Sequence, residues 1–322
     1  MSAATPRPAR ATSKAVADRA GVSRPTVSAI LNGSADLFAQ DTVRRVLQAA
    51  EDLGYEPSII GRALVTGHSN VALLVLPRTR ISEPLQQVID ELDDGLAPLG
   101  LLMILELARA GSTERIIEQM RPRVVIDVGG LSPALRQYSL DSGATVLPDF
   151  DGLADGIGAT QAVYLRDRGH AASDYALVES AQDEVYGPIR FEAFRDHFEA
   201  RGGQSVRSVR VPLDVELAAP VLRRHLDASP ATAIACQNDD VAATVIAAAG
   251  RLGLSVPDRL AVIGADSSLI SQVTVPPMTT VAVRVRELVA GVVAGVSGGA
   301  GQWSDQRASG QSMYSLVRRA SA

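Results

Sequence analysis

The chain has 322 residues, of which 46% are hydrophobic and 21% are charged, and these values are typical of a soluble chain with two or three folded domains. The net charge of −5 argues against indiscriminate binding to nucleic acid. No apolar run approaches the roughly 20 residues that a membrane-spanning helix needs. The single cysteine, Cys236, excludes an intramolecular disulfide and fits a reducing compartment.

The charge is distributed unevenly along the chain. Residues 1–70 contain eight basic and six acidic side chains, a net charge of +2, and the remaining residues carry −7. Residues 1–11 are rich in Ala, Pro and Arg, lack the apolar core of a signal peptide, and are predicted to be a disordered arm. A mildly basic N-terminal part on an acidic body suits local contact with DNA.

Two short helices joined by a tight turn are predicted after this arm, over residues 12–20 and 23–32. Gly21 permits the sharp turn between them. Ser23 is a suitable N-cap for the second helix, and Pro25 falls in its first turn, where a missing N–H costs little. The apolar face of this helix consists of Val27, Ile30 and Leu31, and its polar face of Arg24, Thr26, Ser28 and Asn32. This arrangement predicts a helix-turn-helix.

A third helix is predicted over residues 41–53, and the body of the chain follows from residue 71. The third helix carries apolar residues that would close a three-helix core: Val43, Val46, Leu47, Ala50 and Leu53. In the body, strands are predicted at 71–76, 101–107, 124–128, 144–147, 176–178, 206–211, 231–235 and 261–263. The helices between them are predicted at 85–99, 113–120, 158–168, 187–200, 215–228 and 241–252. Repeated β-α units over about 250 residues predict two doubly wound, Rossmann-like lobes.

The residues of the N-terminal part are more specific than this pattern. The chain resembles the lactose/galactose repressor (LacI/GalR) family in two runs: Thr12-x-x-x-Val16-Ala17-x-x-Ala20-Gly21-Val22-Ser23-x-x-Thr26-Val27-Ser28-x-x-Leu31-Asn32 and Val46-Leu47-x-Ala49-Ala50-x-x-Leu53-Gly54-Tyr55-x-Pro57. Shorter runs in the body resemble that family's effector domain, which is similar to periplasmic sugar-binding proteins. Among them are Asn238-Asp239-x-x-Ala242 and Val262-Ile263-Gly264-x-Asp266.

The resemblance implies an all-α helix-turn-helix head with a hinge helix, followed by an α/β two-lobed periplasmic-binding-protein-like domain with Rossmann-like parallel sheets. The expected divisions are the arm at 1–11, the DNA-binding domain at 12–56, the hinge helix and linker at 57–69, and the effector-binding and dimerisation domain at 70–322. Because the family's chain crosses between its lobes three times, the lobes are expected at about 70–155 with 282–300 and at 156–281 with 301–322.

Residues 57–64 resemble the family's hinge helix. This segment is too short to be stable alone, and Gly61 costs about 0.5–1 kcal/mol of helix stability relative to alanine. We therefore expect the hinge to be disordered in the free protein and ordered on DNA. Leu64 matches the family's leucine that inserts between base pairs in the minor groove and kinks the duplex. The alternative is a plain linker in which Leu64 anchors the next domain.

By the same resemblance, Arg24, Pro25 and Ala29 occupy the positions that contact base edges. An arginine can bind guanine O6 and N7 bidentately, whereas Pro25 and Ala29 offer only apolar contact. The residues that match phosphate-positioning residues are Thr12, Ser23, Thr26, Ser28 and Asn32. Arg62 and Leu64 complete the expected DNA-binding set. The alternative role of the hydroxyl groups is helix capping. Ser23 is expected both to cap its helix and to contact a phosphate.

Ligands of doubly wound sheets bind at the carboxyl ends of the strands. By that rule the candidate residues are Arg78, Glu106, Asp149, Glu179, Asn238 and Asp266. Asn238 and Asp266 also match family positions that hold the hydroxyls and amines of sugars or purines. Val185 stands where the family commonly has a ligand-clamping arginine, so the adjacent Tyr186 is expected to stack on a different ligand. A degenerate pocket controlled by a protein partner stays open as an alternative.

The implied function is a sequence-specific transcriptional regulator, expected to be a repressor. It would bind a pseudo-palindromic operator as a homodimer, respond to a sugar-like or other small-molecule effector, and reside in the cytoplasm at the nucleoid. No enzymatic activity, metal or cofactor is expected, because the four histidines lack ligand spacing and no phosphate-binding glycine motif follows the first strand. Cys236 is expected to be a small buried hydrophobe and Asp239-Asp240 a solvated or capping pair. The alternative class is an α/β small-molecule-binding protein or enzyme with an incidental head.

Overall fold

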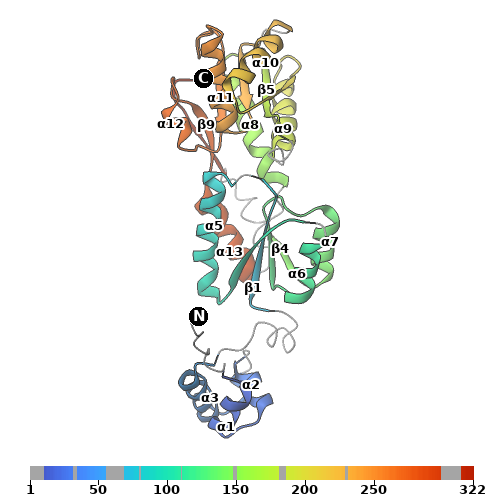
Figure 1. Cartoon of the computed structure of the whole chain (residues 1–322), viewed down its shortest axis with the longest axis vertical. Coiled ribbons are helices and arrows are strands. Elements are labelled where there is room, and N and C mark those ends of the chain that lie inside the picture. Colours follow the sequence, from blue (N-terminus) through green and yellow to red (C-terminus); the bar gives the residue numbers. More distant parts are fainter. Residues whose placement is uncertain are drawn as a thin grey trace, which may run out of the picture.

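The computed structural model describes residues 11–31, 35–55, 69–79, 81–109, 111–147, 151–180, 186–228, 231–298 and 313–322. Three short helices form an N-terminal head, and two α/β lobes follow along the chain (Figure 1). Each lobe has its own sheet and its own buried apolar residues. The predicted hinge, residues 57–64, and the N-terminal arm up to residue 10 lie outside the described residues.

The head contains α1 (Ser13–Ala20), α2 (Arg24–Leu31) and α3 (Gln40–Leu53), with the short 3-10 helix η1 (Ala35–Leu37) before α3. Thr12 caps α1, since its Oγ1 accepts a hydrogen bond from the Ala15 N–H at 3.2 Å. Gly21 ends α1 at a φ of 67°, a left-handed conformation that glycine adopts without strain. The predicted helix pair with its glycine turn is therefore confirmed.

The three helices of the head close a small apolar core, whose buried members are Val16, Ala17, Ala20, Val27, Ile30, Val46, Ala49 and Ala50. One predicted core residue is wrong, because Leu47 is 51% exposed. The reason is the helical register. The inward face of α3 carries Val46, Ala49 and Ala50, three and four positions apart, and Leu47 follows Val46 by about 100° of rotation, which turns it outward.

The first lobe is built on a parallel sheet with the spatial order β2 (Leu102–Leu107), β1 (Val71–Leu76), β3 (Val124–Asp127) and β4 (Thr145–Leu147). The helices that connect these strands are α5 (Glu83–Leu96), α6 (Ser112–Met120) and α7 (Pro133–Asp141), with the short 3-10 helix η2 (Ala97–Leu99) after α5. All six residues of β1 are buried, as expected for a central parallel strand that is covered on both faces.

Two helices of this lobe lie outside the sequence predictions. The periodicity of α7 is weak, since Leu135 and Ser139 are its buried residues. The helix α13 (Val285–Gly298) comes from near the end of the chain, yet it packs on α5 and on the first sheet. A Cβ at Gly95 of α5 would lie 2.8 Å from Cγ2 of Val293, so a glycine allows the two helices to approach closely. A distant segment therefore completes the core of the first lobe.

The second lobe contains a sheet with the order β10 (Tyr314–Val317), β9 (Thr279–Val283), β8 (Ala261–Ala265), β7 (Ala233–Cys236), β5 (Ser173–Val178) and β6 (Ser208–Val211). Its helices are α8 (Asp151–Asp167), α9 (Gly187–Ala200), α10 (Val215–Ala228), α11 (Asp239–Arg251) and the short α12 (Ile270–Val273). The strands are parallel except for β10, which pairs antiparallel with β9. The expected parallel sheets are therefore confirmed except at this edge, where the chain returns after α13.

The helix α8 differs from the prediction at its start and packs closely on α9. α8 begins at residue 151, earlier than the predicted 158, because its glycines obscure the helical pattern. A Cβ at Gly158 would overlap with the carbonyl oxygen of Arg190, so glycine permits the close packing of α8 on α9.

Cys236 ends a fully buried strand, as predicted. Among the described residues, no helix has both the length and the apolar character that crossing a bilayer requires.

Candidate functional site

The second helix of the head presents a polar face to solvent. Arg24 and Pro25 are exposed, whereas Val27 on the opposite face is fully buried in the head core. Ser23 fixes the start of the helix, because its Oγ accepts a hydrogen bond from the Thr26 N–H at 3.2 Å and lies 2.8 Å from Thr26 Oγ1. The first turn of α2 therefore presents an exposed guanidinium from a capped helix end.

The other residues predicted to bind DNA have varied positions. Thr12 is exposed at the start of α1, and Ser28 and Ala29 are half-buried on α2. The hydroxyls of Thr12 and Ser23 do cap helices, so the capping interpretation holds for both. Outside the described residues lie Asn32, Arg62 and Leu64.

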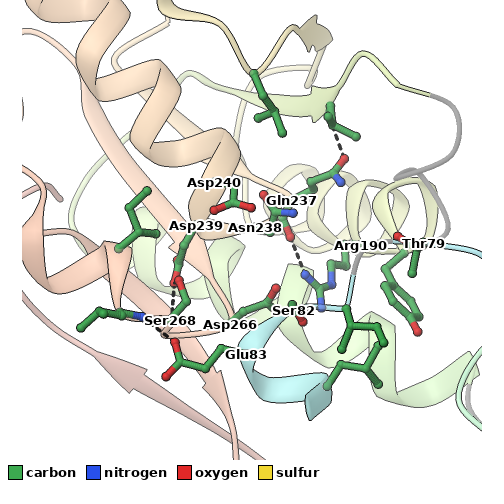
Figure 2. Close-up of a pocket in the computed structure, with 17 residues that line it drawn as sticks. Thr79, Ser82, Glu83, Arg190, Gln237, Asn238, Asp239, Asp240, Asp266 and Ser268 are labelled. Atoms are coloured by element: carbon green, nitrogen blue, oxygen red, sulfur yellow. Dashed lines mark hydrogen bonds and ion pairs between the residues drawn. The ribbon is translucent and has the colours of Figure 1, made fainter. Parts of the chain in front are cut away.

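A cavity of about 290 Å³ lies between the two lobes (Figure 2). The first lobe lines it with the segment that enters α5: Thr79, Ile81, Ser82, Glu83 and Leu85. The second lobe contributes mainly the ends of β5, β7 and β8 and the starts of α9 and α11: Val178, Tyr186, Arg190, Leu213, Gln237, Asn238, Asp239, Asp240, Asp266, Ser268, Leu269 and Ile270. The cavity therefore lies at the carboxyl ends of parallel strands, where doubly wound folds bind ligands.

Three of the predicted ligand-binding residues line this cavity: Tyr186, Asn238 and Asp266. Arg78 and Glu179 also follow strand ends, but both are exposed and neither lines the cavity. Glu106 is on β2 at the edge of its sheet, faces the Thr113 hydroxyl at 3.5 Å, and does not line it either. Asp149 lies outside the described residues.

Arg190 is the cavity residue that the sequence analysis missed. Its Nη2 lies 3.0 Å from Asp266 Oδ1, its Nη1 donates to the Gln237 carbonyl, and its guanidinium stacks 5.6 Å from the centre of the Tyr186 ring. The sequence analysis placed Val185, which lies outside the described residues, at the arginine position and inferred that the clamp is lost. The inference that the cavity lacks an arginine is wrong. The helix α9, which begins at residue 187, carries Arg190 into the cavity in its first turn.

The floor of the cavity is held by side-chain amides. Gln237 is buried, and its Oε1 accepts a hydrogen bond from the Val178 N–H at 2.9 Å, which ties the end of β7 to the end of β5. Gln161 on α8 is also buried, and its Nε2 donates to the carbonyls of Cys236 and Gly264, each at 2.9 Å. These amides satisfy backbone groups at the ends of three strands and hold the floor in one geometry.

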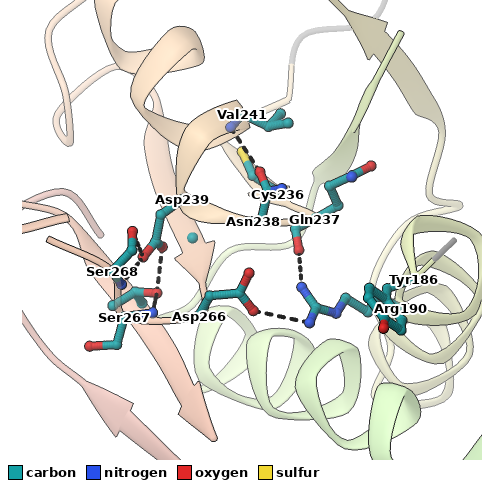
Figure 3. A network of polar contacts seen from close by, with 12 residues as sticks. Tyr186, Arg190, Cys236, Gln237, Asn238, Asp239, Val241, Asp266, Ser267 and Ser268 are labelled. Atoms are coloured by element: carbon teal, nitrogen blue, oxygen red, sulfur yellow. Dashed lines mark hydrogen bonds and ion pairs between the residues drawn. The ribbon is translucent and has the colours of Figure 1, made fainter. Parts of the chain in front are cut away.

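Asp239 is a buried residue of the cavity wall (Figure 3). Its carboxyl group accepts hydrogen bonds from the Ser268 N–H at 2.7 Å, the Ser268 hydroxyl at 3.0 Å and the Thr280 hydroxyl at 2.6 Å. The pKa of Asp239 is raised to about 7, mainly by burial and also by the neighbouring Asp266 carboxylate, against the lowering effect of these hydrogen bonds. Of the expected solvated or capping pair Asp239-Asp240, only Asp240 is exposed to solvent, and the solvated alternative is wrong for Asp239.

Asn238, which follows the end of β7, both caps a helix and lines the cavity. It is the N-cap of α11, because its Oδ1 accepts a hydrogen bond from the Val241 N–H at 3.0 Å. It also lines the cavity, and its side-chain amide group is still available as a donor to a ligand. The capping bond fixes the orientation of this side chain.

Hydrogen bonds between described residues join the lobes at the cavity. The Leu269 N–H donates to Glu83 Oε2 at 2.8 Å, and the Tyr186 hydroxyl donates to the Val128 carbonyl at 2.5 Å. Asp127 positions that carbonyl, because its Oδ1 accepts from the backbone N–H groups of residues 129–131 at distances between 2.9 and 3.1 Å. Burial raises the pKa of Asp127 despite these bonds. Both contacts join residues of different lobes, so they depend on the angle between the lobes.

Comparison with known families gives two matches. Residues 12–58 match the model described as bacterial regulatory proteins, lacI family, and residues 162–322 match the model described as a periplasmic binding protein-like domain. The two matched segments contain the helix-turn-helix and most of the second lobe. They support the same assignment as the arrangement of head, lobes and cavity.

Similar proteins with assigned names are transcriptional regulators. The regulator DegA of Bacillus subtilis is 26% identical over 296 residues, which cover 85% of this chain and 86% of DegA. The regulator CelR of Thermobifida fusca is 28% identical over 299 residues, 84% of this chain and 86% of CelR. The transcriptional repressor PurR of Histophilus somni is 28% identical over 301 residues, which cover 84% of this chain and 86% of PurR.

Solved structures share the fold at lower identity. A lac repressor dimer bound to operator and the anti-inducer ONPF matches with a TM-score of 0.66 at 18% identity, over 97% of this chain and 99% of the repressor chain. A CelR–cellobiose complex matches with a TM-score of 0.57 at 21% identity, over 97% of this chain and the whole of that chain.

A capped helix-turn-helix joined to a two-lobed α/β body defines a DNA-binding transcriptional regulator with a periplasmic-binding-protein-like domain. The chain belongs to the lacI family of bacterial regulatory proteins.

Proposed function

We propose that the protein represses transcription by binding a pseudo-palindromic operator as a homodimer, and that a small molecule bound between its lobes controls this binding. The observation that carries the proposal is the exposed first turn of α2, where Arg24 projects from a helix end that Ser23 caps. Two-fold symmetry of a dimer would place two such helices on two half-sites, which makes the operator palindromic.

In this proposal, Arg24 contacts a guanine in the major groove of each half-site. A bidentate pair of this kind contributes about 1–3 kcal/mol of discrimination between bases. Pro25 and Ala29 offer apolar surface that suits a thymine methyl group. The proposed phosphate contacts are Thr12, Ser23, Thr26, Ser28 and Asn32, whose hydroxyl and amide groups fix the register on the duplex.

The hinge is proposed to order on DNA, with Arg62 and Leu64 as contacts in the minor groove. The match of residues 12–58 to the lacI family model ends within the hinge, at its second residue. Paired Leu64 side chains would separate a central base step, and the resulting bend would allow more protein to contact the duplex.

Exposed apolar side chains support the homodimer. The edge strand β2 carries Leu102, Leu105 and Leu107 with exposed fractions of 48%, 41% and 38%. In the second lobe, Val273 and Val275 are 66% and 88% exposed. A lone monomer would leave apolar surface on both lobes in water, and a second copy would bury it. The structure of a lac repressor dimer on its operator is consistent with this arrangement.

The effector is proposed to bind in the cavity between the lobes, at Tyr186, Arg190, Asn238 and Asp266. These residues supply an aromatic face, hydrogen-bond donors and acceptors at one end of a parallel sheet. The CelR relative has been solved with cellobiose, which favours a sugar-like or similar polar metabolite. A ligand changes DNA binding only if it prefers one arrangement of the lobes, so breaking the Glu83–Leu269 and Tyr186–Val128 bonds is the proposed link.

The organisation is proposed to follow the limits given by the resemblance: a DNA-binding domain at 12–56, a hinge and linker at 57–69, and a two-lobed domain at 70–322. The lobes would be 70–155 with 282–300 and 156–281 with 301–322. Since the similar named proteins are regulators, we propose that the chain has no enzymatic activity and works in the cytoplasm at the nucleoid.

Selection of binding sites from random DNA by the purified full-length protein tests this proposal. We expect an enriched pseudo-palindrome with a fixed central step. Enrichment of a single, non-repeated half-site would contradict the dimeric mode of binding. Binding that depends on salt alone, without any enriched sequence, would contradict the proposed repressor function.

A further inference from the structure

The cavity between the lobes is acidic. Its described lining holds the carboxyl groups of Glu83, Asp239, Asp240 and Asp266 and the single guanidinium of Arg190. Figure 2 shows Arg190 on one side of the cavity and Glu83, Asp239 and Asp240 on the other, with Asp266 between them. A ligand that enters the cavity therefore meets an excess of negative charge on the side away from Arg190.

The two terminal nitrogens of the Arg190 guanidinium already have partners, whereas its Nε is buried without a hydrogen-bond partner among the described residues. The guanidinium forms an ion pair with Asp266 at 3.0 Å and donates to the Gln237 carbonyl, and the residue is 9% exposed. An anionic ligand would have to displace Asp266 from this buried pair and leave the Asp266 carboxylate without its partner. Charges interact strongly in such an environment, so the cavity disfavours phosphate or carboxylate groups on a ligand.

The carboxyl groups on the opposite side have spare capacity. Within the described part of the chain, the exposed Asp240 carboxylate makes no hydrogen bond or ion pair, and Glu83 accepts the single Leu269 N–H through Oε2. A carboxylate has two oxygens and accepts about four hydrogen bonds. Asp240 and Glu83 therefore present acceptor sites to a donor group within the cavity.

The position of these carboxyl groups favours an organic cation over a metal ion. In the described ranges, no group of three or more His, Cys, Asp or Glu side chains is placed to hold a metal. A primary ammonium group needs only a few acceptors and carries three N–H donors. It suits acceptors that come from two different lobes, as Asp240 and Glu83 do.

The rest of the cavity suits the uncharged part of such a ligand. Ser82 and Asn238 supply neutral hydrogen-bonding groups. A neighbouring cavity of about 100 Å³ has a mainly apolar lining that includes Leu85 and Ile157, and it shares Tyr186 with the first. The ligand would therefore place its charge on the acidic side and its ring or chain toward Tyr186.

We propose that the effector is a small hydroxylated amine whose ammonium group binds on the acidic side of the cavity, against Asp240 and Glu83. This inference rests on the proposed function, because it takes the cavity as the effector site. The positive charge would distinguish this effector from cellobiose, the neutral sugar bound by the CelR relative.

Matched probes that differ only in charge test the inference. The first set is glucose, glucose with its primary hydroxyl replaced by an amine, and glucose phosphorylated at that hydroxyl. The second set is adenosine with the same three groups at its primary ribose position. In calorimetric titrations of the full-length protein, we expect the amine to bind at least about tenfold more tightly than its neutral counterpart in at least one set, as a charged hydrogen bond would give. The phosphorylated members should not bind.

A variant of Asp240 gives the matched test within the protein. Asp240→Asn keeps the size of the side chain and should weaken binding of the amine about tenfold while leaving the neutral probe unchanged. Asp93→Asn removes an exposed carboxylate of α5 that does not line the cavity, and it should change neither affinity. Thermal unfolding without ligand checks that both variants are folded. Equal losses in the two variants would contradict a direct contact with Asp240.

Tighter binding of a neutral or phosphorylated probe, or no binding by either amine, would overturn the proposal. The selection of DNA sites uses no ligand. It therefore tests the proposed repressor function independently of the inference about the effector. A protein that selects an operator but prefers a phosphorylated probe would be a regulator with an anionic effector. If the protein binds an amine but selects no operator, the inference about the ligand stands and the proposed repressor function is contradicted.

Discussion

The Arg190 guanidinium and the Asp266 carboxylate lie 3.0 Å apart at the floor of the cavity, although 76 positions separate them in the sequence. The side chains are only 10% and 13% exposed. Asp266 adopts a φ of 95°, a left-handed conformation that aspartate and asparagine tolerate better than most residues. The pair therefore joins α9 to the loop after β8 and closes one wall of the cavity.

Removing one member of this pair should destabilise the body strongly. Arg190→Met leaves the Asp266 carboxylate buried without its partner, and we expect a loss of about 3–5 kcal/mol in the free energy of unfolding, measured with urea. The double variant Arg190→Met, Asp266→Asn should lose less, because no uncompensated charge is left. Arg195→Met, on the same helix, breaks an exposed pair with Asp196 and should have no measurable effect. Equal losses in the single and double variants would contradict the argument from charge.

Asp239 should make the stability of the body depend on pH. Its folded pKa of about 7 lies above the ordinary value of 3.8, so the protonated form is favoured in the folded state. This contribution is fully present below the ordinary pKa and is lost as the pH rises through about 7. The groups that face Asp239 are Ser268, Thr280, Asp266 and Cys236.

Asp239→Asn tests this dependence. The variant should lose less stability than the parent protein between about pH 5 and about pH 8, by on the order of 1 kcal/mol, because asparagine does not ionise. Urea unfolding at the two pH values measures the difference. Asp240→Asn serves as the control at the adjacent exposed position. An unchanged slope of stability against pH in Asp239→Asn would exclude Asp239 as its source.

Arg24→Ala should relax the sequence preference at one base position in each half-site. The expected loss is about 1–3 kcal/mol on the preferred operator and little on operators changed at that base pair, since a bidentate contact is removed. Binding measurements on a set of single-base operator variants test this. Arg223→Ala, at an exposed position on α10, is the matched control. An unchanged preference at every position would exclude Arg24 from base contact.

Leu64→Ala should weaken binding to the operator while leaving binding to random DNA nearly intact. Loss of the proposed insertion should cost about 1–3 kcal/mol, the typical value of one specific contact. Titrations on both DNAs at the same salt concentration measure the difference. An equal loss on random DNA would contradict insertion at a specific base step. Leu217→Ala, on the surface of α10 at 61% exposed, controls for the loss of a leucine.

Leu105→Lys should weaken the proposed dimer. Leu105 is 41% exposed on the edge strand β2, and a lysine there would place a buried charge at a two-fold contact. Sedimentation should show a shift toward monomer and weaker binding to the full operator. Leu217→Lys changes an exposed leucine on another face and should leave the dimer intact. If the Leu105→Lys protein is fully dimeric, β2 is not part of the dimer interface.

The local pattern of the sequence predicted most of the secondary structure. The helices over residues 187–200 and 215–228 have the predicted limits, and the helix pair of the head follows from Ser23, Gly21 and the spacing of its apolar residues. These features depend on interactions between residues at most four positions apart. The pattern failed at α7, where the apolar stripe is narrow, and at Leu47, which lies beside the inward face formed by Val46, Ala49 and Ala50 but turns outward.

The candidate site was predicted only in part. Asn238 and Asp266 follow strand ends, so the rule for doubly wound sheets located them. The same rule also selected Arg78 and Glu179, which do not line the cavity, because it identifies the edge of a sheet but not the face toward which a side chain turns. A signal for Arg190 existed in the small and aromatic pair Ala193-Phe194, which resembles the glycine-aromatic pair that follows the family's arginine.

By itself, the sequence determined the helix-turn-helix, the alternation of strands and helices, and the membership of the family. Tertiary structure alone decided that Asp239 is buried and that Arg190 pairs with Asp266. The physical reason is range. Helix capping and periodicity act within a few residues, whereas burial and ion pairing depend on which distant segments the folded chain brings together.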